Sequence, residues 1–440
     1  MSGTLSPINL IREAFHYRSR YEGSVMVFKI DFPVTEDPGF PYLMKDLALL
    51  AKTGFKIVIV PGAREAIDEI LKRRGINSSY ADGVSHEPLR ITGAEAIPFV
   101  EMAAFHAATR FMTYLSGSRV DAVIGNFVRA RGLGVVDGAD MGHTGTVDKI
   151  YTDSICRVLN LGMIPILPCI GRNPSGKPYN VPVDEIALAV SAALGAVKLF
   201  IVTAGARKGL FPLPANIETR DDGSIIRLTP QEAEAVIGSY PAGETPGELK
   251  LALKASLAGV ERVHIIDGGE EGAVLKELFS NLGAGTMVYA DVYESIRPLH
   301  SRDLPDILRL TEPLMQAGIL VRRTAEQIQE KKDDYSVFEI DSSVRACGAL
   351  HDWGEGQGEI AAVAADPFYS GMNLGRRIVS YLIDKARKNG MKRVFVLTTA
   401  TQDWFESLGF SEAAVDSLPE QKRRVYDQSR KSKIFALVVR

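Results

Sequence analysis

Short apolar runs alternate with helical stretches through the first two thirds of the chain. Most of the runs are apolar at nearly every position, which is typical of strands buried on both faces. They lie at Val25–Ile30, Phe55–Val60, Met163–Leu167, Val197–Thr203 and Arg262–Asp267. Apolar residues at helical spacing lie between them, at residues 40–53, after Pro61-Gly62, at 185–194 and at 247–258. This alternation predicts an α/β domain over residues 23–288, with a mostly parallel sheet between helices.

A different pattern begins near Ile296. We expect a helix that starts at Asp303, with this residue as its N-cap. Closely spaced strands follow at Tyr335–Ile340, Val344–His351 and Glu359–Ala365, which predicts an antiparallel meander. A loop with glycines then leads into a helix that ends near Gly390, and one more strand follows at Val394–Leu397. We therefore assign residues 295–440 to a second domain of α+β type.

The first 22 residues read as a lone helical arm. Ile8, Ile11 and Phe15 fall at helical spacing, and no second helix precedes the first strand. Such an arm either packs on another subunit or closes over its own domain as a lid. The sequence leaves both alternatives open.

Composition and charge narrow the class of protein. Lys and Arg number 51 against 54 Asp and Glu, for a net charge of −3, which argues against a dedicated nucleic-acid binder. The three cysteines are too few and too scattered for a disulfide framework or a zinc site, and we expect no metal. No signal peptide and no membrane-length apolar run is evident. A cytoplasmic protein without a membrane partner is the expectation.

A glycine-containing loop before a helix suits phosphate binding. The segment DPFYSGMNLGRRIVSYLI brings Gly371, Gly375, Arg376 and Arg377 to a helix start. Backbone N–H groups and the helix dipole favour an anion at such a place.

The order of elements around this loop resembles the GNAT acetyltransferases. Those enzymes hold the acetyl-CoA pyrophosphate at a loop of the pattern Gln/Arg, two residues, Gly, one residue, Gly/Ala. This chain has Ser370, Asn373 and Gly375 at these places, so two of the three depart from the pattern. The resemblance implies acetyl-CoA as co-substrate, bound by Val363, Ala364, Ser370, Gly371, Met372, Asn373, Leu374, Gly375 and Arg376.

A narrower resemblance covers nearly the whole chain. The segments AGILVRRT, GEIAAVAADP and VFVLTTATQDWFESLGF are similar to the C-terminal half of the bacterial N-acetylglutamate synthases, which join an amino-acid-kinase-like domain to a GNAT domain. The resemblance implies transfer of the acetyl group of acetyl-CoA to L-glutamate, the first step of arginine biosynthesis.

Acetyl transfer to an amine needs a base, an oxyanion donor and a proton for the leaving thiolate. The resemblance points to Glu359 as the base and to a backbone N–H near Val363 or Ala364 as the donor. Many GNAT enzymes protonate the thiolate with a tyrosine where this chain has Trp404-Phe405. Thr398 or water is the expected substitute.

Glutamate carries two carboxylates, so a selective pocket should present two separate cations. Arg322 in LVRR and Arg430 in RKSK match the substrate positions of the family. The Leu320 backbone and the Ser432 hydroxyl are the expected neighbouring contacts.

The first domain resembles the acetylglutamate kinases but departs from them at the phosphate loops. Lys29 and Asp184 match family positions. Asp31-Phe32 and Ala63-Arg64 stand where glycines are expected, and such side chains would block or repel phosphates. We expect a kinase fold without kinase activity.

Arginine-inhibited members of the family share an additional set of residues. This chain carries the set as Tyr21, His264, Glu277, Gly283 and Gly285. The resemblance implies L-arginine as an allosteric inhibitor, and a homo-oligomeric ring such as a hexamer.

Three alternatives remain open from the sequence. One is a bifunctional synthase and kinase. Another is an amino-acid-sensing regulatory protein with a degenerate acetyltransferase domain, which the departures at Ser370 and Asn373 would fit. The third is a GNAT enzyme that acts on a different amine.

Overall fold

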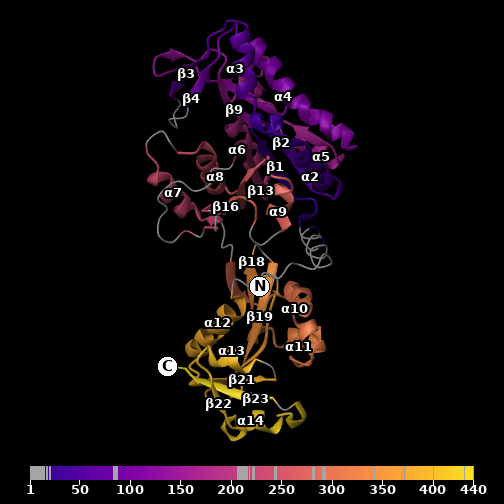
Figure 1. Cartoon of the computed structure of the whole chain (residues 1–440), viewed down its shortest axis with the longest axis vertical. Helices are drawn as coiled ribbons and strands as arrows, with labels where there is room; N and C mark the ends of the chain where they lie inside the picture. The colour runs from indigo at the N-terminus through magenta and orange to yellow at the C-terminus, as the bar shows by residue number, and fades with distance from the viewer. Residues whose placement is uncertain are drawn as a thin grey trace. The chain divides into compact units, whose positions relative to one another are not determined.

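The chain divides into two compact units, Met1–Asp291 and Val292–Arg440 (Figure 1). We describe each unit by itself. The assignment of an arm at 1–22 and of domains at 23–288 and 295–440 stays a prediction, and most of the arm lies outside the described residues. The computed structural model describes residues 15, 18, 21–82, 88–205, 217, 219–220, 223–241, 245–279, 283–289, 294–340, 343–367, 369, 373–399, 401–430 and 432–439.

The first unit is built on an eight-stranded sheet. Its strands run parallel except at one edge, where β16 pairs antiparallel with β15 and β14 joins β16. Each predicted apolar run lies in one of these strands. The order is β14 (Arg227–Leu228), β16 (Thr286–Tyr289), β15 (Arg262–Asp267), β13 (Lys198–Thr203), β1 (Val25–Ile30), β2 (Lys56–Pro61), β10 (Ile164–Ile166) and β5 (Ala122–Ile124).

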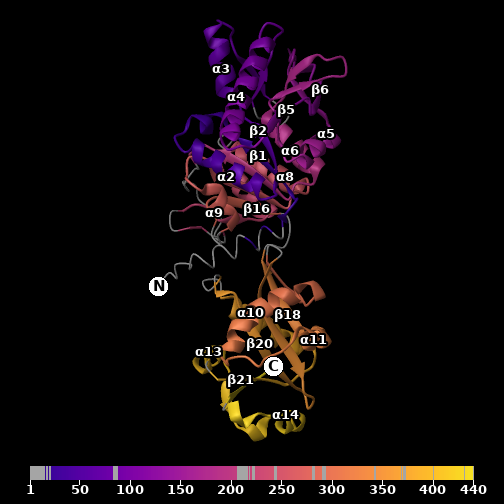
Figure 2. The same ribbon diagram turned by 90° about the vertical axis from the view of Figure 1, so that its right-hand side faces the viewer.

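Helices cover both faces of this sheet because alternate residues of each central strand point to opposite cores. Val27 belongs to the core beneath α5–α8, whereas its neighbour Phe28 belongs to the core beneath α2, α4 and α9. Figure 2 shows the two groups of helices on either side of the sheet. The helices are α2 (Phe40–Lys52), α3 (Arg64–Arg73), α4 (Ile97–Gly117), α5 (Thr152–Asn160), α6 (Val183–Leu194), α7 (Pro230–Ser239), α8 (Gly247–Leu257) and α9 (Ala273–Phe279).

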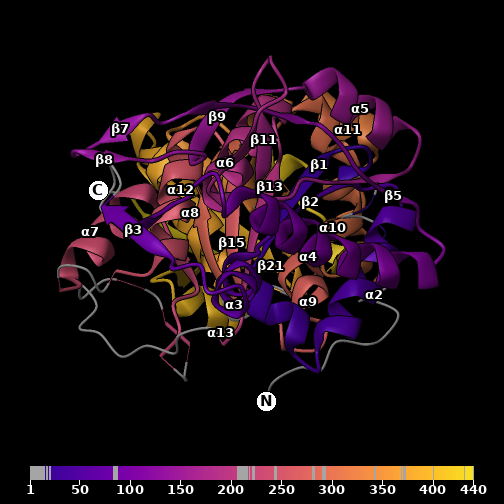
Figure 3. The same cartoon turned by 90° about the horizontal axis from the view of Figure 1, so that it is seen from above.

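Aromatic side chains join α2 to α4, which lie side by side in Figure 3. The rings of Phe40 and Phe111 meet edge to face with centroids 5.3 Å apart. Smaller sheets complete the unit. One has the order β12 (Pro178–Asn180), β11 (Ile170–Arg172), β6 (Val128–Gly132) and β9 (Gly145–Ile150), and two-stranded pairs form from β3 (Ser79–Asp82) with β4 (Pro88–Ile91) and from β7 (Val135–Val136) with β8 (Ala139–Asp140).

The second unit is a seven-stranded sheet in which only β20 and β21 run parallel. The predicted meander is confirmed as β18, β19 and β20. The order is β17 (Glu294–Pro298), β18 (Tyr335–Ile340), β19 (Ser343–Asp352), β20 (Gln357–Ala365), β21 (Arg393–Thr398), β23 (Lys433–Val438) and β22 (Ser411–Ala413).

Two helices cover opposite faces of this second sheet (Figure 1). Helix α12 packs on the face that includes Phe338, and α10 packs on the face that includes Val337. The α+β class predicted for this part is confirmed. The helices are α10 (Leu304–Gln316), α11 (Ala325–Glu330), α12 (Leu374–Lys388), α13 (Gln402–Glu406) and α14 (Glu420–Arg424), with a 3-10 turn η3 (Lys332–Asp334) before β18.

The expected role of Asp303 at α10 is wrong in one respect. Asp303 holds the N-cap position of α10, but its side chain makes no capping hydrogen bond to that helix. Its carboxylate instead accepts from the His300 backbone N–H at 2.8 Å and from Arg297 at 2.7 Å. The carboxylate binds Arg297 rather than the N–H groups of the helix, because a hydrogen bond between two charged groups is stronger than one to a neutral backbone N–H.

Strands β20 and β21 separate part of the way along. Within the described residues, β20 pairs with β21 only over Gln357–Glu359, although β20 continues to Ala365. Ala362 has a φ of 53°, a left-handed conformation that is rare for alanine, and the pairing of β20 with β19 shifts register there. Among the described residues, positions 360–365 of β20 thus have no ladder partner on the β21 side, in the middle of the sheet.

Candidate functional sites

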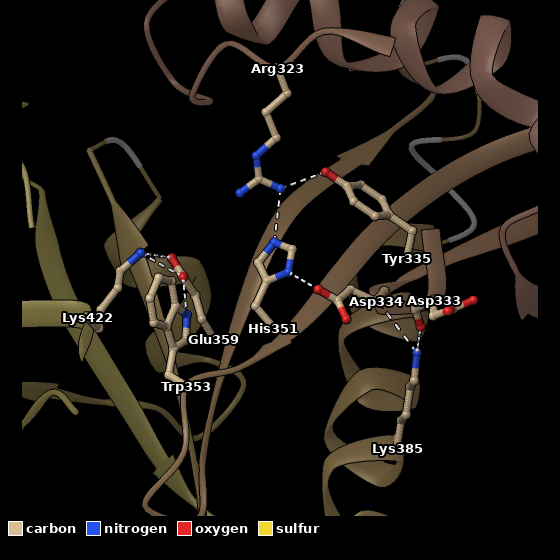
Figure 4. A network of polar contacts seen from close by, with 9 residues as sticks. All are labelled: Arg323, Asp333, Asp334, Tyr335, His351, Trp353, Glu359, Lys385 and Lys422. Carbon is tan, nitrogen blue, oxygen red and sulfur yellow. Dashed lines mark hydrogen bonds and ion pairs between the residues drawn. The ribbon is translucent and has the colours of Figure 1, made fainter. Parts of the chain in front are cut away.

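A buried carboxylate lies at the point where β20 and β21 separate. The Glu359 side chain is 8 % exposed. Its Oε2 accepts a hydrogen bond from Trp353 Nε1 at 2.8 Å, and Lys422 Nζ lies 2.8 Å from Oε1 and 2.7 Å from Oε2 (Figure 4). Trp353 and Lys422 were not predicted from the sequence. Lys422 is 63 residues from Glu359 along the chain, so no local pattern could reveal the pair.

A second polar chain runs beside this carboxylate. His351 on β19 stands directly opposite Glu359 on β20 in the strand register. His351 Nδ1 lies 2.6 Å from Asp334 Oδ2, and Nε2 lies 3.0 Å from an Arg323 nitrogen that also donates to the Tyr335 hydroxyl at 2.6 Å (Figure 4). Burial, together with the charge of Arg323, outweighs Asp334 and holds the pKa of His351 below its ordinary value of 6.5.

The bulge in β20 carries the predicted oxyanion donors. Ala364 stands in register with Cys347 of β19, whereas Ala362 and Val363 lie in the bulge opposite Gly348. The Cys347 thiol donates to the Ala362 carbonyl oxygen at 3.6 Å. Of the two predicted donors, Val363 is therefore the one whose backbone lies outside the β19 ladder.

The predicted coenzyme loop ends in a left-handed residue. Asn373 has φ 52° and ψ 34° at the N-cap of α12, with no side-chain capping bond. Asparagine tolerates this conformation better than most residues, which explains how it can stand where the family has glycine. The N–H groups of Leu374, Gly375 and Arg376 form the first turn of α12, where helical N–H groups have no partner within the helix. Ser370, Gly371 and Met372 lie outside the described residues.

The two predicted substrate segments meet. Arg430 donates to the carbonyl oxygens of Gly318 at 3.0 Å and Ile319 at 3.3 Å, next to Leu320. Arg322 is exposed, and its guanidinium has no hydrogen-bond or ion-pair partner among the described residues. The Ser432 carbonyl accepts from the Tyr426 hydroxyl at 2.7 Å.

Thr398, the candidate for protonation of the leaving thiolate, lies at the end of β21. Its hydroxyl is 2.8 Å from the Thr401 hydroxyl and accepts the Thr401 backbone N–H at 3.0 Å. These contacts close the turn before α13. Any role of Thr398 in proton transfer stays a prediction.

A second polar cluster lies in the first unit, between β15, α9 and the turn before β16. Glu277 Oε1 is 2.6 Å from His264 Nδ1, and Oε2 accepts from the backbone N–H groups of Ala284 at 2.6 Å and Gly285 at 2.8 Å. Burial favours the neutral acid, but the His264 contact and these N–H groups outweigh it and lower the pKa of Glu277 to about 2. Gly283 has a φ of 60°, and a Cβ there would collide with the Glu277 carboxylate.

The remaining member of the predicted arginine set lies close to this cluster. Tyr21 is 8 % exposed, and Lys198 Nζ lies 5.5 Å from the centre of its ring. Lys198 Nζ also lies 3.5 Å from His264 Nε2. The structure thus brings together Tyr21, His264, Glu277, Gly283 and Gly285, which are spread over 265 positions of the sequence.

Lys29, the lysine that matches the kinase pattern, forms ion pairs with two carboxylates of the same unit. Lys29 Nζ lies 2.7 Å from Asp31 and 3.0 Å from Asp184. Burial alone would lower the pKa of Lys29, but the two carboxylates outweigh it and raise the pKa above its ordinary value. Asp31, which stands where a glycine is expected, therefore neutralises the Lys29 ammonium group that a bound phosphate would need.

The described residues offer neither a metal site nor a membrane-spanning helix. In the described part of the chain, no group of three or more His, Cys, Asp or Glu side chains is placed to hold a metal ion. None of the described helices combines the length and apolarity that a membrane crossing requires.

Family models match both units. Residues 33–267 match the amino acid kinase family, and residues 293–410 match the GNAT acetyltransferase family. The amino-acid acetyltransferase of Escherichia coli K12 is 33 % identical over 96 % of this chain and 96 % of its own length. That of Neisseria meningitidis Z2491 is 33 % identical over 94 % of both chains.

Solved structures give the same result. N-acetylglutamate synthase from Neisseria gonorrhoeae, complexed with coenzyme A and L-arginine, has a TM-score of 0.82 and 32 % identity. The same enzyme complexed with coenzyme A and N-acetyl-glutamate has a TM-score of 0.60 and 33 % identity. Each match covers 99 % of this chain and 100 % of the other.

Proposed function

Because this chain belongs to the amino-acid acetyltransferase family, which includes N-acetylglutamate synthase, we propose that it makes N-acetyl-L-glutamate from acetyl-CoA and L-glutamate. It is a GNAT acyltransferase, with acetyl-CoA as its co-substrate. The reaction would be the first step of arginine biosynthesis. The observation that carries the glutamate assignment is the buried Glu359 at the open side of β20, in the same unit as two arginine segments that meet.

The proposed chemistry starts at the amino group. The α-ammonium of glutamate loses a proton to Glu359, directly or through water, and the nitrogen attacks the thioester carbonyl carbon. The backbone N–H of Val363 stabilises the negative charge on the carbonyl oxygen. The C–S bond then breaks, the nitrogen gives up its second proton to water, and the departing thiolate of coenzyme A takes a proton from water or from Thr398.

Lys422 and Trp353 hold the Glu359 carboxylate in one orientation. Both oxygens face the ammonium of Lys422, and one of them also accepts from the Trp353 indole. A carboxylate fixed by two donors loses little rotational freedom when substrate arrives. We propose that both residues position the base.

Two cations would select for glutamate. Arg322 is exposed and unpaired among the described residues, and Arg430 donates to main-chain carbonyls through only one of its nitrogens. We propose that these guanidinium groups bind the two carboxylates, with the Leu320 backbone and Ser432 beside them. Glutamine lacks one carboxylate and should bind less well by roughly 1.5–3 kcal/mol.

The coenzyme would lie across the opening between β20 and β21. Its pyrophosphate would lie at the first turn of α12, which follows the left-handed Asn373 and whose N–H groups have no partner within the helix. The bound coenzyme A of the gonococcal enzyme supports this assignment.

Thiol release from acetyl-CoA with a panel of amino acids tests the proposal. Glutamate should support turnover, and glutamine should have a specificity constant about ten- to a hundred-fold lower. Comparable constants would contradict the two-arginine pocket, and no release with glutamate would contradict the proposed activity. The panel also separates this function from a GNAT enzyme acting on another amine and from an inactive sensor.

We also propose that L-arginine inhibits the enzyme by binding at the Glu277 cluster. The carboxylate of Glu277 would pair with the guanidinium, and Gly283 and Gly285 would contact the amino-acid end. The arginine complex of the gonococcal enzyme supports arginine binding. Glu277→Ala should abolish inhibition and retain activity without arginine, whereas unchanged inhibition would locate the site elsewhere.

Phosphoryl transfer is the disfavoured second activity. The Lys29–Asp31 ion pair neutralises the charge that a triphosphate would need, and the bulk of the Arg64 side chain, at the start of α3, would crowd the second loop where the family has glycine. ATP-dependent formation of an acyl phosphate at a rate near that of acetyl transfer would favour the bifunctional alternative instead. A homo-oligomeric ring, such as a hexamer, and a cytoplasmic location complete the proposal as predictions.

A further inference from the structure

We propose that His351 is a positioning residue for the glutamate-binding segment, and that its neutral ring keeps this segment in place by accepting a hydrogen bond from Arg323. The inference rests on the proposed function, because it assumes that Leu320 and Arg322 contact glutamate. It adds a residue to which neither the family pattern nor the chemistry of acetyl transfer assigned a role.

The hydrogen bonds fix the state of the ring. Arginine can only donate, so His351 Nε2, 3.0 Å from the Arg323 guanidinium, must be the acceptor. The proton then resides on Nδ1 and is donated to Asp334 Oδ2 at 2.6 Å. Asp334, His351 and Arg323 thus form a directional chain that passes from the turn before β18, across β19, to the segment after α10 (Figure 4).

Arg323 links that chain to the proposed substrate segment. It directly follows Arg322 and lies three residues after Leu320. Its side chain is half-buried, and the hydrogen bonds that the structure gives its guanidinium run to His351 and to the Tyr335 hydroxyl, both from one nitrogen. Displacement of this one nitrogen therefore breaks both contacts of the guanidinium.

Protonation of His351 would displace the Arg323 nitrogen that donates to it. The imidazolium has no lone pair at Nε2, and it places a second positive charge beside the guanidinium. Two acidic and two basic side chains also surround the ring. Asp334 comes from η3, and Glu359 comes from β20 with its partner Lys422. Lys385 comes from α12 and donates to the Asp333 carbonyl at 2.9 Å. The burial of His351 favours the neutral ring at neutral pH.

The expected consequence is a KM for glutamate that depends on pH and a KM for acetyl-CoA that does not. At neutral and alkaline pH the segment is held and glutamate binds normally. As the pH falls below 6.5, the KM for glutamate rises while the KM for acetyl-CoA stays level. A role of His351 in folding alone would not separate the two constants in this way.

Steady-state thiol release by the full-length enzyme from pH 5.5 to pH 8 tests the inference. His351→Ala should raise the KM for glutamate about ten-fold or more at every pH, with a smaller change in kcat. His351→Gln retains an uncharged acceptor, so its KM should stay near that of the wild type and lose its rise at low pH. Asp334→Asn removes the carboxylate that favours the protonated ring, so the rise should shift to lower pH.

His300→Gln is the matched control. His300 also accepts from an arginine, with its Nδ1 3.1 Å from Arg297, but it lies on the surface outside the substrate segment. This variant should match the wild type at every pH. The isosteric Asp334→Asn variant keeps the test valid if His351→Ala fails to fold.

The outcomes separate the inference from the proposed function. If the wild type releases thiol with glutamate, but the KM of His351→Ala is unchanged or Asp334→Asn leaves the profile where it was, the inference is wrong and the function stands. If the wild type releases no thiol with glutamate, both fail.

Discussion

Glu359 is the residue on which the proposed proton transfer depends. Glu359→Gln retains the size of the side chain and an acceptor for Trp353, but it removes the base. We expect kcat to fall by about two orders of magnitude, the usual size of a general-base contribution, with the KM for acetyl-CoA nearly unchanged. Steady-state thiol release across pH measures both constants.

A surface carboxylate provides the control for that substitution. Glu412 lies on β22 and faces Lys433 at 3.8 Å, so Glu412→Gln also removes a lysine partner, but at an exposed site. It should leave kcat within the error of the wild type, as surface pairs contribute little. Near-normal turnover of Glu359→Gln would exclude Glu359 as the base.

Glu277 should make the stability of the first unit depend on acid pH. Its pKa is about 2 in the folded chain, against an ordinary 4.5, so the folded state gains stability from the ionised carboxylate above pH 4.5. That gain is lost as the pH falls from 4.5 towards 2. The difference in urea midpoint between the wild type and Glu277→Gln should therefore shrink between pH 6 and pH 3, whereas a constant difference would contradict the assignment.

The individual site residues differ in how far the sequence reveals them. The motif segments locate Glu359, Arg430 and the Glu277 set, because each lies in a stretch with a recognisable pattern. Lys422 and Arg323 escape notice, since their roles arise only from contacts across 63 and 28 positions of the chain. In the sequence, a lysine or arginine that contacts a buried polar group looks the same as one that lies on the surface.

The turn before α12 shows why a departure from the family pattern at Asn373 need not weaken binding of acetyl-CoA. Asn373→Gly supplies the residue that adopts a left-handed conformation most easily, so the KM for acetyl-CoA should stay the same or fall. Asn373→Val puts a β-branched side chain at a φ of 52°, which should cost about 1–2 kcal/mol and raise that KM. Titration of both variants with coenzyme A measures the effect, and equal affinities would exclude a role for the turn.

Helices and central strands follow from apolar patterning, whereas the small sheets do not. The runs that became β1, β2, β13 and β15 are apolar on both faces, which few structures other than a buried strand permit. Strands β6, β9, β11 and β12 mix apolar residues with glycine, proline and charged or polar residues, so their pairing depends on tertiary contacts. The bulge at Ala362 and the separation of β20 from β21 are likewise properties of the assembled sheet.

Coupling between the two units must act in both directions. If arginine at the Glu277 cluster weakens binding of acetyl-CoA or glutamate, then these ligands must weaken arginine binding by the same factor. Calorimetric titration with L-arginine should therefore give a higher Kd when coenzyme A and N-acetylglutamate are present at saturation. We expect a factor of about 5–150, the usual range for allosteric coupling.

Glu359→Gln offers a control for that measurement, because it removes the base but not the arginine site. Its Kd for arginine should match that of the wild type, with and without the second set of ligands. An arginine Kd that is indifferent to these ligands in the wild type would mean that arginine binding is not coupled to ligand binding in the second unit, so that any inhibition acts on kcat alone.

The gap between β20 and β21 has a consequence for the handling of the protein. An unpaired strand edge is a template on which another chain can form a β-ladder, and here residues 360–365 of β20, which include no charged residue and no proline, do not pair with β21 in the described structure. A ligand that lies along this edge shields it, and any ligand that binds only the folded state also lowers the unfolded population by mass action. Purification and storage with coenzyme A should thus slow aggregation, because the bound coenzyme covers the strand edge of the sheet that binds it.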